Sequence, residues 1–445
     1  MSLFKKKISA VKVPHHKNTA AIASVVAPPP PEVLVPTNMQ SGDAAIPVVS
    51  AGDHVYVGQL IAKAGVKNSV PLHATVSGTV VGIEPYKLTG RPAEAIRIAS
   101  DGKMERDPDL KPPVVHDLDE FLKAVSDSGV VGLGGAAFPV WAKLDAIRKN
   151  PIPTVLVNGA ECEPYITSDH RMMLEHADWI KKGIELLKEY LKSEEFIIGI
   201  EKNKPDAIEH LKQVFADDKA VRVMPLASVY PQGAKQVLLF NATGKVVGPG
   251  QRLASLGVII INVTSLAMVG RYFLDGTPLI SRSITVDGSA VAQPKNIEFP
   301  IGTPISYVIE QCGGWKGTPG KIIYGGAMMG KTVTDLNAPV LKATNAILAF
   351  DENDSKKSPA VPCIHCGRCV EACPLNLNPT EFTHAMEIDD EDRRAAILNR
   401  EQVSLCMECG CCSFVCPAHR PLAENNTAAR SFIRKYNAAK KEGGK

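Results

Sequence analysis

The sequence predicts a multidomain α/β protein that begins with a β-rich domain and ends in a helical domain rich in cysteine. Three observations lead to this prediction. Short valine and isoleucine runs separated by glycine turns fill residues 40–100, as in small β domains. Strand-like apolar runs alternate with amphipathic helical patterns over residues 117–273, which indicates a largely parallel sheet. Nine of the 11 cysteines lie between Cys363 and Cys416 at the spacing of metal ligands.

The composition excludes several classes of protein. The chain has 445 residues and a net charge of +3, which is too close to neutral to favour a nucleic-acid partner. Its apolar runs are far shorter than the roughly 20 residues that span a bilayer, and no signal peptide pattern follows the first lysines. Any association with a membrane is therefore expected to come through partners.

Residues 1–112 are predicted to form the N-terminal β-rich domain, with a proline-rich linker. The segments Gly52–Leu60 and Ala74–Val80 resemble the two repeated hairpins of biotinyl and lipoyl carrier domains, which implies a barrel-sandwich hybrid. Lys67 lies near the position of the modified lysine in those domains, but its neighbours differ from those that a modifying ligase recognises. We therefore expect an unmodified barrel that serves in docking or packing.

Three further domains are predicted after the barrel. Residues 113–273 should form a Rossmann-like α/β domain, residues 274–350 a small β-grasp-like α+β module, and residues 351–445 the helical cysteine domain with a basic tail. Strands are expected at residues 154–158, 196–200 and 221–224, and helices at residues 179–191, 305–311, 380–386, 391–399 and 427–437.

The α/β domain contains a glycine-rich loop between Gly129 and Pro139, with the sequence G-V-V-G-L-G-G-A-A-F-P. Such a loop before a helix can bring backbone N–H groups close to a phosphate. It lacks the G-x-G-x-x-G pattern of the Rossmann fingerprint, so a simple tight turn explains the loop equally well on this evidence alone.

A second motif, Asn158 to Pro164, directly follows the first predicted strand and has the sequence N-G-A-E-C-E-P. It places an amide and the carboxylates of Glu161 and Glu163 at the carboxyl end of a strand, where ligands bind in open α/β sheets. Carboxylates at this position can bind ribose hydroxyls or face a ring. The alternative is that both glutamates belong to a solvated loop surface.

Two cysteine runs share the spacing C-x2-C-x2-C-x3-C-P, which is that of bacterial ferredoxins with two [4Fe–4S] clusters. Because the fourth cysteine of each run leaves its loop on a helix, we expect it to reach the other cluster. One cluster would have the ligands Cys363, Cys366, Cys369 and Cys416, and the second would have Cys406, Cys409, Cys412 and Cys373. The long helical spacer between the runs is typical of α-helical ferredoxin domains.

A zinc ribbon is the alternative for paired C-x2-C runs, but zinc would not need the third cysteine and the x3-C-P ending in both halves. Cys411 breaks the shared spacing, so we expect it not to be a ligand.

The glycine-rich loop and the Asn158 motif together resemble the flavin-binding subunit of respiratory complex I. The chain more closely resembles the C subunits of Rnf complexes, the ion-pumping ferredoxin–NAD oxidoreductases of bacteria. This resemblance covers most of the chain, including Tyr230–Gly233, Asn262–Thr264 and the two cysteine runs, in this order.

The resemblance implies that FMN is bound non-covalently and that NAD(H) is the substrate. The residues implied for FMN are Gly132, Gly134, Gly135, Lys143, Asn158 and Asn262. NADH is implied to stack near Phe138, with Glu161 and Glu163 lining the pocket as the candidate catalytic residues. Leu133 stands where the complex I subunits have arginine and Ala137 where they have glycine, so Lys143 is the candidate for the missing positive charge.

A flavin is needed between these sites because NADH gives two electrons as hydride, whereas an iron–sulfur cluster takes one at a time. The expected protein is a peripheral subunit on the cytoplasmic face of the bacterial membrane. It would exchange electrons between NAD(H) and ferredoxin-linked partners while the other Rnf subunits translocate Na⁺ or H⁺.

Two alternatives remain. The first is a free-standing cobalamin reductase of the microcompartment type, but in that group the flavin motif comes close to the N-terminus, and here a barrel precedes it. The second is a carrier or scaffold protein whose nucleotide-binding fold has decayed. The presence of both Glu161 and Glu163 beside an intact glycine-rich loop argues against decay.

Overall fold

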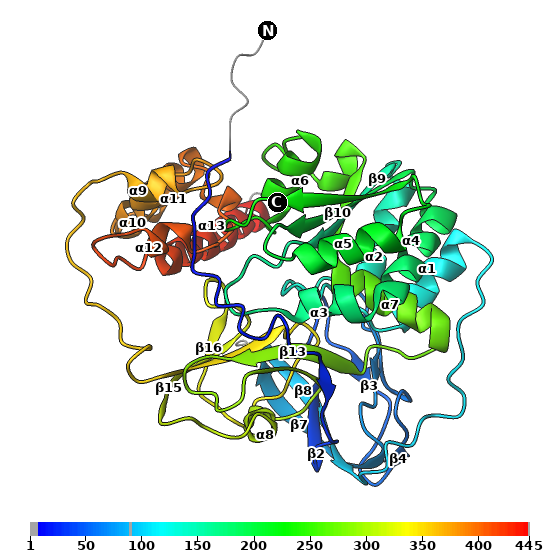
Figure 1. The fold of residues 1–445 in the computed structure, drawn as a ribbon. Coiled ribbons are helices and arrows are strands. Elements are labelled where there is room, and N and C mark those ends of the chain that lie inside the picture. Colours follow the sequence, from blue (N-terminus) through cyan, green and yellow to red (C-terminus); the bar gives the residue numbers. More distant parts are fainter. Residues whose placement is uncertain (1–7, 89–90, 444–445) are drawn as a thin grey trace.

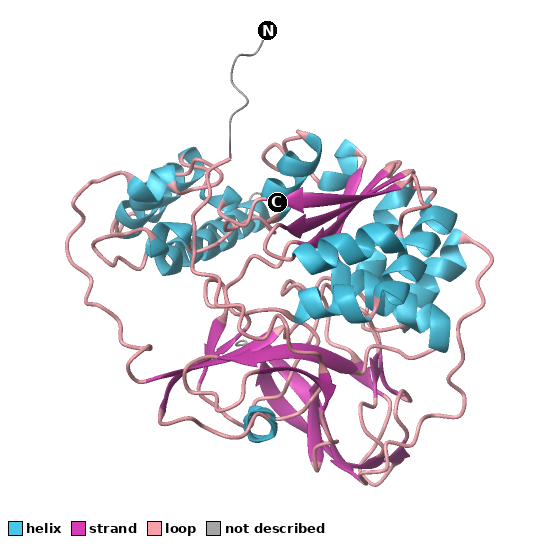
Figure 2. Cartoon of the chain, viewed as in Figure 1, coloured by secondary structure: helices cyan, strands magenta, loops and turns pink. Residues whose placement is uncertain are grey.

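The computed structural model describes residues 8–88 and 91–443. The α/β domain and the helical cysteine domain lie side by side, and two β-rich units lie below them (Figure 1). Figure 2 shows the same division by structure type, since the cysteine domain consists of helices and loops and the lower units are mostly strands. The four units follow one another along the chain in the order that the sequence predicts.

The barrel consists of two small sheets with strand orders β2-β8-β7-β4 and β3-β5-β6. The longest strands, β7 and β8, pair antiparallel, and their inward side chains, including Ile96 and Ile98, are fully buried. The strands are β2 (Glu32–Pro36), β3 (Ile46–Pro47), β4 (His54–Val55), β5 (Leu60–Lys63), β6 (Leu72–His73), β7 (Gly78–Leu88) and β8 (Arg91–Ser100). The short strands and glycine turns confirm the β-rich prediction for this region.

The α/β domain is built on a parallel sheet with the order β11-β10-β9-β12. Its strands are apolar runs, and β9 and β12 are buried almost throughout because helices cover both faces. The strands are β9 (Thr154–Gly159), β10 (Glu195–Glu201), β11 (Val221–Leu226) and β12 (Val258–Asn262). The helices are α1 (Leu118–Asp127), α2 (Val140–Leu144), α3 (Ser168–Glu175), α4 (Ala177–Leu191), α5 (Pro205–Val214), α6 (Lys235–Thr243) and α7 (Val263–Asp275).

Helices α4 and α7 approach each other closely at Gly270. A Cβ atom at this position would lie 2.0 Å from the backbone carbonyl oxygen of Trp179, so a larger residue would push the helices apart. This packing fixes α7, whose first residues follow the carboxyl end of β12.

The β-grasp-like module adds a mixed sheet of order β1-β14-β13-β17-β15-β16. One helix, α8 (Ile305–Gln311), covers it, and its bounds agree with the sequence prediction. The strands are β1 (Val25–Val26), β13 (Ser281–Asp287), β14 (Lys295–Pro300), β15 (Pro319–Tyr324), β16 (Lys331–Val333) and β17 (Ala346–Asp351).

The cysteine domain packs its helices around a small core that includes Phe382, Leu398 and Ile433. The helices are α9 (Arg368–Glu371), α10 (Pro379–Met386), α11 (Glu391–Arg400), α12 (Cys411–Phe414) and α13 (Leu422–Gly443). Among the described residues, no helix combines the length and the apolar character needed to cross a membrane.

The first described residues do not join the barrel. Residues 8–27 run between the cysteine domain and the α/β domain and then along the β-grasp-like module (Figure 1). Val11 forms an antiparallel bridge with Tyr230, and β1 pairs with β14. We call residues 8–27 the N-terminal segment, and it connects three of the four units.

Candidate functional site

Two asparagines end neighbouring strands at the carboxyl edge of the parallel sheet. Asn158 is in β9 and Asn262 in β12, and the two residues are partners across these strands. Asn158 donates through Nδ2 to the carbonyl oxygen of Gly233 at 2.9 Å. Asn262 caps α7 by accepting a hydrogen bond from the N–H of Ser265 at 3.0 Å. The sheet therefore brings the two predicted side chains to one place, as expected for a ligand site in an open α/β sheet.

The glycine-rich loop lies against this edge. Its base is held by a 2.8 Å hydrogen bond from the N–H of Gly132 to the carbonyl oxygen of Phe138. A Cβ atom on Gly134 would lie 3.4 Å from the side chain of Asn262, so loop and strand end are in contact. The backbone at Gly134–Ala136 is exposed, and its three N–H groups have no hydrogen-bond partner among the described residues. Exposed, unpaired N–H groups fit the phosphate of a flavin nucleotide.

Two departures from the complex I pattern have structural explanations. Leu133 is 1% exposed, so its side chain belongs to the core, while its N–H donates to the hydroxyl of Ser265 at 2.8 Å. Ala137 has a φ of 48°, a left-handed conformation that costs a non-glycine residue roughly 1–2 kcal/mol. The loop thus keeps a backbone path suited to glycine although alanine occupies the position.

Lysine side chains bring positive charge to the same region. Lys143 in α2 donates through Nζ to the carbonyl oxygen of Ile260 in β12 at 2.9 Å. Burial, with the charge of Lys235 nearby, lowers the pKa of Lys143 to about 8. Lys235, which begins α6, is exposed and did not figure among the predicted residues. Lys235 closely follows the Tyr230–Gly233 motif in the sequence. This proximity is the sequence signal that could have identified it as a site residue.

Asp169 is another residue that the sequence did not single out. Its carboxylate accepts from Nδ2 of Asn262 at 2.8 Å and from the hydroxyl of Thr264 at 2.5 Å. Burial raises the pKa of Asp169, while the bond from Thr264 and the charge of Arg282 oppose this. No motif marks Asp169, because its role depends on where α3 packs.

The carboxylate of Glu161 lies at the N-terminus of α3. It accepts hydrogen bonds from the N–H groups of Asp169 at 2.6 Å and His170 at 3.3 Å, in the first turn of α3. A carboxylate is favourable at a helix N-terminus. Burial raises the pKa of Glu161, and the charges of Lys17 and Lys204 oppose this shift. These contacts are inconsistent with the alternative of a solvated loop surface at this residue.

Two lysines hold the Asn158–Pro164 loop through hydrogen bonds to its backbone carbonyl oxygens. Lys17, in the N-terminal segment, donates through Nζ to the carbonyl oxygens of Glu161 at 2.9 Å and Glu163 at 2.8 Å. Lys204 donates to the carbonyl oxygen of Ala160 at 2.8 Å. Burial lowers the pKa of Lys17, opposed chiefly by Glu161. Lys17 lies in a stretch without periodicity, so no sequence signal pointed to it.

Glu163 connects the loop to the β-grasp-like module. Its carboxylate accepts from the N–H of Met328 at 2.9 Å and lies 3.5 Å from the hydroxyl oxygen of Tyr230. A Cβ atom on Gly326 would lie 2.3 Å from this carboxylate, which explains a glycine in the β15–β16 loop. Burial raises the pKa of Glu163, and the bond from Met328 opposes the shift.

Tyr230 connects the same region to the cysteine domain. Its side chain is 1% exposed, and its hydroxyl donates to the backbone carbonyl oxygen of Cys409 at 2.7 Å. Cys162 and Met328 pack into the same apolar cluster as Tyr230 and Cys409. The α/β domain and the second cysteine run are therefore joined by direct, buried contact.

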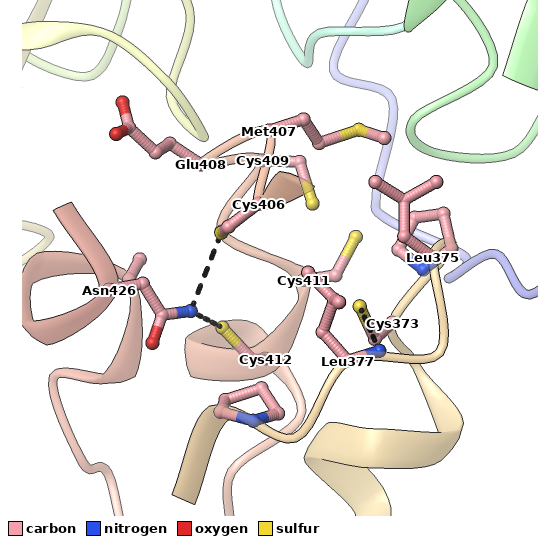
Figure 3. A pocket seen from close by; sticks show the side chains of 14 residues that line it. Cys373, Leu375, Leu377, Cys406, Met407, Glu408, Cys409, Cys411, Cys412 and Asn426 are labelled. Carbon is pink, nitrogen blue, oxygen red and sulfur yellow. Dashed lines mark hydrogen bonds between the residues drawn. The ribbon is translucent and has the colours of Figure 1, made fainter. Parts of the chain in front are cut away.

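The second run surrounds a cavity, which we call the inner cavity (Figure 3). The four cysteines expected to share one cluster all line it. They are Cys373, Cys406, Cys409 and Cys412. Cys411 also lines this cavity and is 1% exposed, so it lies beside the expected ligands although its spacing sets it apart. Four thiols around a cavity fit an iron–sulfur cluster.

The first run surrounds a second, more exposed cavity, which we call the outer cavity. Its lining includes the other expected set, Cys363, Cys366, Cys369 and Cys416. Cys366 and Ile364 are exposed there, whereas the run-two cysteines of the inner cavity are buried. Each fourth cysteine therefore lies with the other run, which is the crossed arrangement expected from the spacing. Among the described residues, no three histidine, cysteine or acidic side chains converge closely enough to hold a single metal ion.

Phe138 is half-buried at the end of the glycine-rich loop, and no contact among the described residues joins its ring to Glu161 or Glu163. The structure thus gathers the glycine-rich loop, Asn158, Asn262 and Lys143 at one edge. It directs the two glutamate carboxylates toward α3 and toward the β15–β16 loop.

Four sequence families match successive parts of the chain. They are the RnfC barrel sandwich hybrid domain over residues 6–103, the Nuo51 FMN-binding domain over residues 125–271, the SLBB domain over residues 283–332 and the 4Fe-4S dicluster domain over residues 359–431. These matches confirm the predicted barrel-sandwich hybrid, flavin-type α/β domain and iron–sulfur domain.

Curated proteins are similar over most of the chain. The C subunit of the Na(+)-translocating ferredoxin:NAD(+) oxidoreductase complex of Acetobacterium woodii is 38% identical over 82% of this chain and 84% of that protein. The proton-translocating counterpart of Clostridium ljungdahlii is 40% identical over 82% and 80%. The C subunit of the ion-translocating oxidoreductase complex of Rhodobacter capsulatus is 34% identical over 86% and 75%.

A solved structure shares the fold. An NAD+-reducing [NiFe]-hydrogenase in the air-oxidized state aligns with a TM-score of 0.50 and 18% identity, covering 72% of this chain and 63% of that chain.

Proposed function

The chain belongs to the family of C subunits of ion-translocating ferredoxin:NAD(+) oxidoreductase complexes, and we propose that it is the electron-transfer subunit that exchanges electrons with NAD(H). Its partners are then the other subunits of such a complex, with ferredoxin reached indirectly. Relatives with the names sodium- and proton-translocating match this chain about equally well, so the proposal leaves the coupling ion open.

The observation that carries the proposal is the contact between the two candidate sites. The edge formed by the glycine-rich loop, Asn158 and Asn262 is linked through Tyr230 to the inner cavity. A protein that only bound a nucleotide would not need a buried connection from that site to a set of cysteines.

FMN, when bound, accepts two electrons together as hydride and releases them one at a time. We propose that the N–H groups of Gly134, Gly135 and Ala136 bind its phosphate, with Gly132 shaping the loop. Lys143 and Lys235 add positive charge that favours the phosphate. NADH would then enter beside Phe138.

Asn158 and Asn262 would orient the ring system, because their amides lie at the strand ends next to the loop. Glu161 and Glu163 act by fixing the Asn158–Pro164 loop, which forms the floor of the proposed pocket. Glu161 fixes the start of α3, and Glu163 fixes the loop against the β-grasp-like module. Lys17 and Lys204 compensate the negative charge buried under this floor.

The two cavities would each hold one [4Fe–4S] cluster, with the crossed ligand sets described above. Tyr230 joins the inner cavity to the sheet edge where FMN is proposed to bind, so electrons would pass to the inner cluster first. The outer cavity, with Cys366 exposed, would exchange electrons with a neighbouring protein of the complex. Transfer rates fall steeply with distance, which makes an exposed cluster the natural exit.

We place the protein on the cytoplasmic face of the membrane, because NAD(H) and ferredoxin are found there. Membrane attachment would come through the partner subunits of the complex.

The test uses the full chain purified without oxygen. We expect about eight irons and one FMN per chain, a flavin spectrum with broad thiolate-to-iron absorption, and bleaching of both features by NADH. Cys363→Ser and Cys406→Ser should each lose about four irons and a different electron paramagnetic resonance signal. About two metals per chain with zinc present, or a spectrum unchanged by NADH, would contradict the proposal.

A further inference from the structure

One polar side chain that lines the inner cavity, the amide of Asn426, donates hydrogen bonds to two of its cysteines. Asn426 donates through Nδ2 to Sγ of Cys406 and to Sγ of Cys412, each at 3.7 Å (Figure 3). Asn426 is 2% exposed, and its Oδ1 has no partner among the described residues. A buried carbonyl oxygen without a partner is costly, so this placement of the amide requires an explanation.

The orientation of the amide follows from chemistry. A thiolate sulfur is an acceptor, and the asparagine NH₂ group has two hydrogens, one for each sulfur. The reverse orientation would place a carbonyl oxygen against two negative sulfurs and leave both donors unpaired. The NH₂ group therefore faces the cysteines.

Helix α13 holds this amide in place. The N–H of Ala423 donates to the hydroxyl of Ser413 at 2.8 Å, and Arg430 pairs with Glu408 at 2.6 Å. Residues 423, 426 and 430 share one face of a helix. That face is fixed to the second cysteine run at both ends, with Asn426 between the two contacts.

In the described part of the chain, the outer cavity has no counterpart to this contact. Among the described residues, the sulfur of Cys363 receives a bond only from a backbone group, the N–H of His365 at 3.4 Å. No side-chain amide donates to Cys366, Cys369 or Cys416 in the described part of the chain. The two cavities thus differ in the donors that they offer to their sulfurs.

We propose that Asn426 is a positioning residue that raises the reduction potential of the inner cluster. Reduction adds negative charge to the cluster and its thiolates, and an N–H donor to sulfur stabilises that charge. Two such donors therefore favour the reduced form. The inference rests on the proposed cluster in the inner cavity, and it adds that a single helix residue adjusts how readily that cluster accepts an electron.

The experiment compares Asn426→Leu with the wild type and with Asn425→Leu. Asn425 is the matched control, because it precedes Asn426 on the same helix but donates to the hydroxyl of Thr383 at 3.2 Å, away from the sulfurs. Iron content is measured first, and each cluster's midpoint potential is then measured by redox titration followed by electron paramagnetic resonance.

For Asn426→Leu we expect full iron content and a fall of roughly tenfold in the one-electron reduction equilibrium of one cluster, about 59 mV. The other cluster and the Asn425→Leu protein should keep wild-type potentials. Unchanged potentials in Asn426→Leu, or an equal shift in Asn425→Leu, would overturn the proposal.

If Asn426→Leu loses the inner cluster, Asn426→Ser decides, because serine keeps one donor. In Asn426→Ser, a midpoint potential of the inner cluster between those of the wild type and a cluster without the donors supports the proposal. A wild-type midpoint potential overturns the proposal. Loss of the cluster in both variants also overturns it, since Asn426 would then be needed to hold the cluster rather than to tune it. A wild-type iron content near two metals would instead contradict the proposed function itself.

Discussion

The phenolic hydroxyl of Tyr230 donates a 2.7 Å hydrogen bond to the backbone carbonyl oxygen of Cys409. Both groups are buried, so removing the donor leaves a buried carbonyl oxygen unpaired, at a cost of about 1–3 kcal/mol. We expect Tyr230→Phe to lower the thermal stability of the cysteine domain and to slow reduction of the clusters after the flavin. Stopped-flow spectra with NADH would show flavin reduction at the wild-type rate and delayed cluster bleaching. Equal delays in both steps would contradict this role.

Cys411 lines the inner cavity, yet its spacing excludes it from the ligand set. We expect Cys411→Ser to keep about eight irons and both cluster signals. Cys412→Ser, the adjacent change on the same helix, should lose about four irons. Iron analysis and electron paramagnetic resonance distinguish the two. The opposite result, with loss in Cys411→Ser and retention in Cys412→Ser, would mean that the register of the second run is wrong.

Glu161 caps α3 and offsets the charges of Lys17 and Lys204. A hydrogen bond to a charged group contributes about 1.5–3 kcal/mol, so Glu161→Gln should lower kcat/KM for NADH oxidation with an artificial acceptor roughly tenfold. Glu163→Gln should act similarly through the β15–β16 loop, and iron content should not change.

The matched control for these two variants is Glu175→Gln, at the other end of α3, where the carboxylate pairs with Arg171. It should keep wild-type kinetics. Wild-type kinetics in both Glu161→Gln and Glu163→Gln would place the nicotinamide pocket elsewhere.

His73 makes the junction of three units sensitive to acid. Burial and the nearby charge of Lys342 lower the pKa of His73 to about 3, and Lys342 donates to the carbonyl oxygens of Pro71 and Gly129. Below about pH 6.5 the His73 imidazole binds a proton in the unfolded chain but not in the folded chain. The folded chain is therefore fully stable above that pH, and its free energy of unfolding decreases as the pH falls.

When the pH falls from 7.5 to 5.5, the free energy of unfolding of the wild type should therefore decrease by about 1.4 kcal/mol. A His73→Asn variant should not show this decrease. Chemical unfolding of anaerobic protein at the two pH values measures this difference. His116→Asn, at an exposed site, is the control and should behave like the wild type. Parallel pH profiles for wild type and His73→Asn would refute the expectation.

The parts of the site that the sequence predicted depend on local rules. Asn158 and Asn262 end strands of one parallel sheet, and parallel neighbours end at the same edge. The spacing predicts crossed cysteine sets because each fourth cysteine leaves its loop on a helix, and the four cysteines of each predicted set line one cavity. The helix over residues 305–311 was also predicted, and α8 has the same bounds.

The residues that the sequence did not predict act through contacts between distant segments. Lys17 reaches carbonyl oxygens 144 and 146 positions away, and nothing in its own neighbourhood signals this. Asp169 and Asn426 lie on ordinary amphipathic helices, and their roles appear only once α3 and α13 are packed. Sequence patterns report the face of a helix, whereas these roles depend on what that face meets.

The N-terminal segment has a consequence for how the chain is made. Thr19 accepts from Asn296, 277 positions later, and at roughly 5–20 residues per second a ribosome needs about 14–55 s to make that stretch. Residues 8–27 must therefore wait, unplaced, while the barrel and the α/β sheet form behind them. Lys17 cannot brace the Asn158–Pro164 loop until that loop exists, and Val11 cannot bridge to Tyr230 until still later. The N-terminal segment is thus synthesised before the residues that it contacts, and it takes its place only after the α/β sheet and β14 have been made.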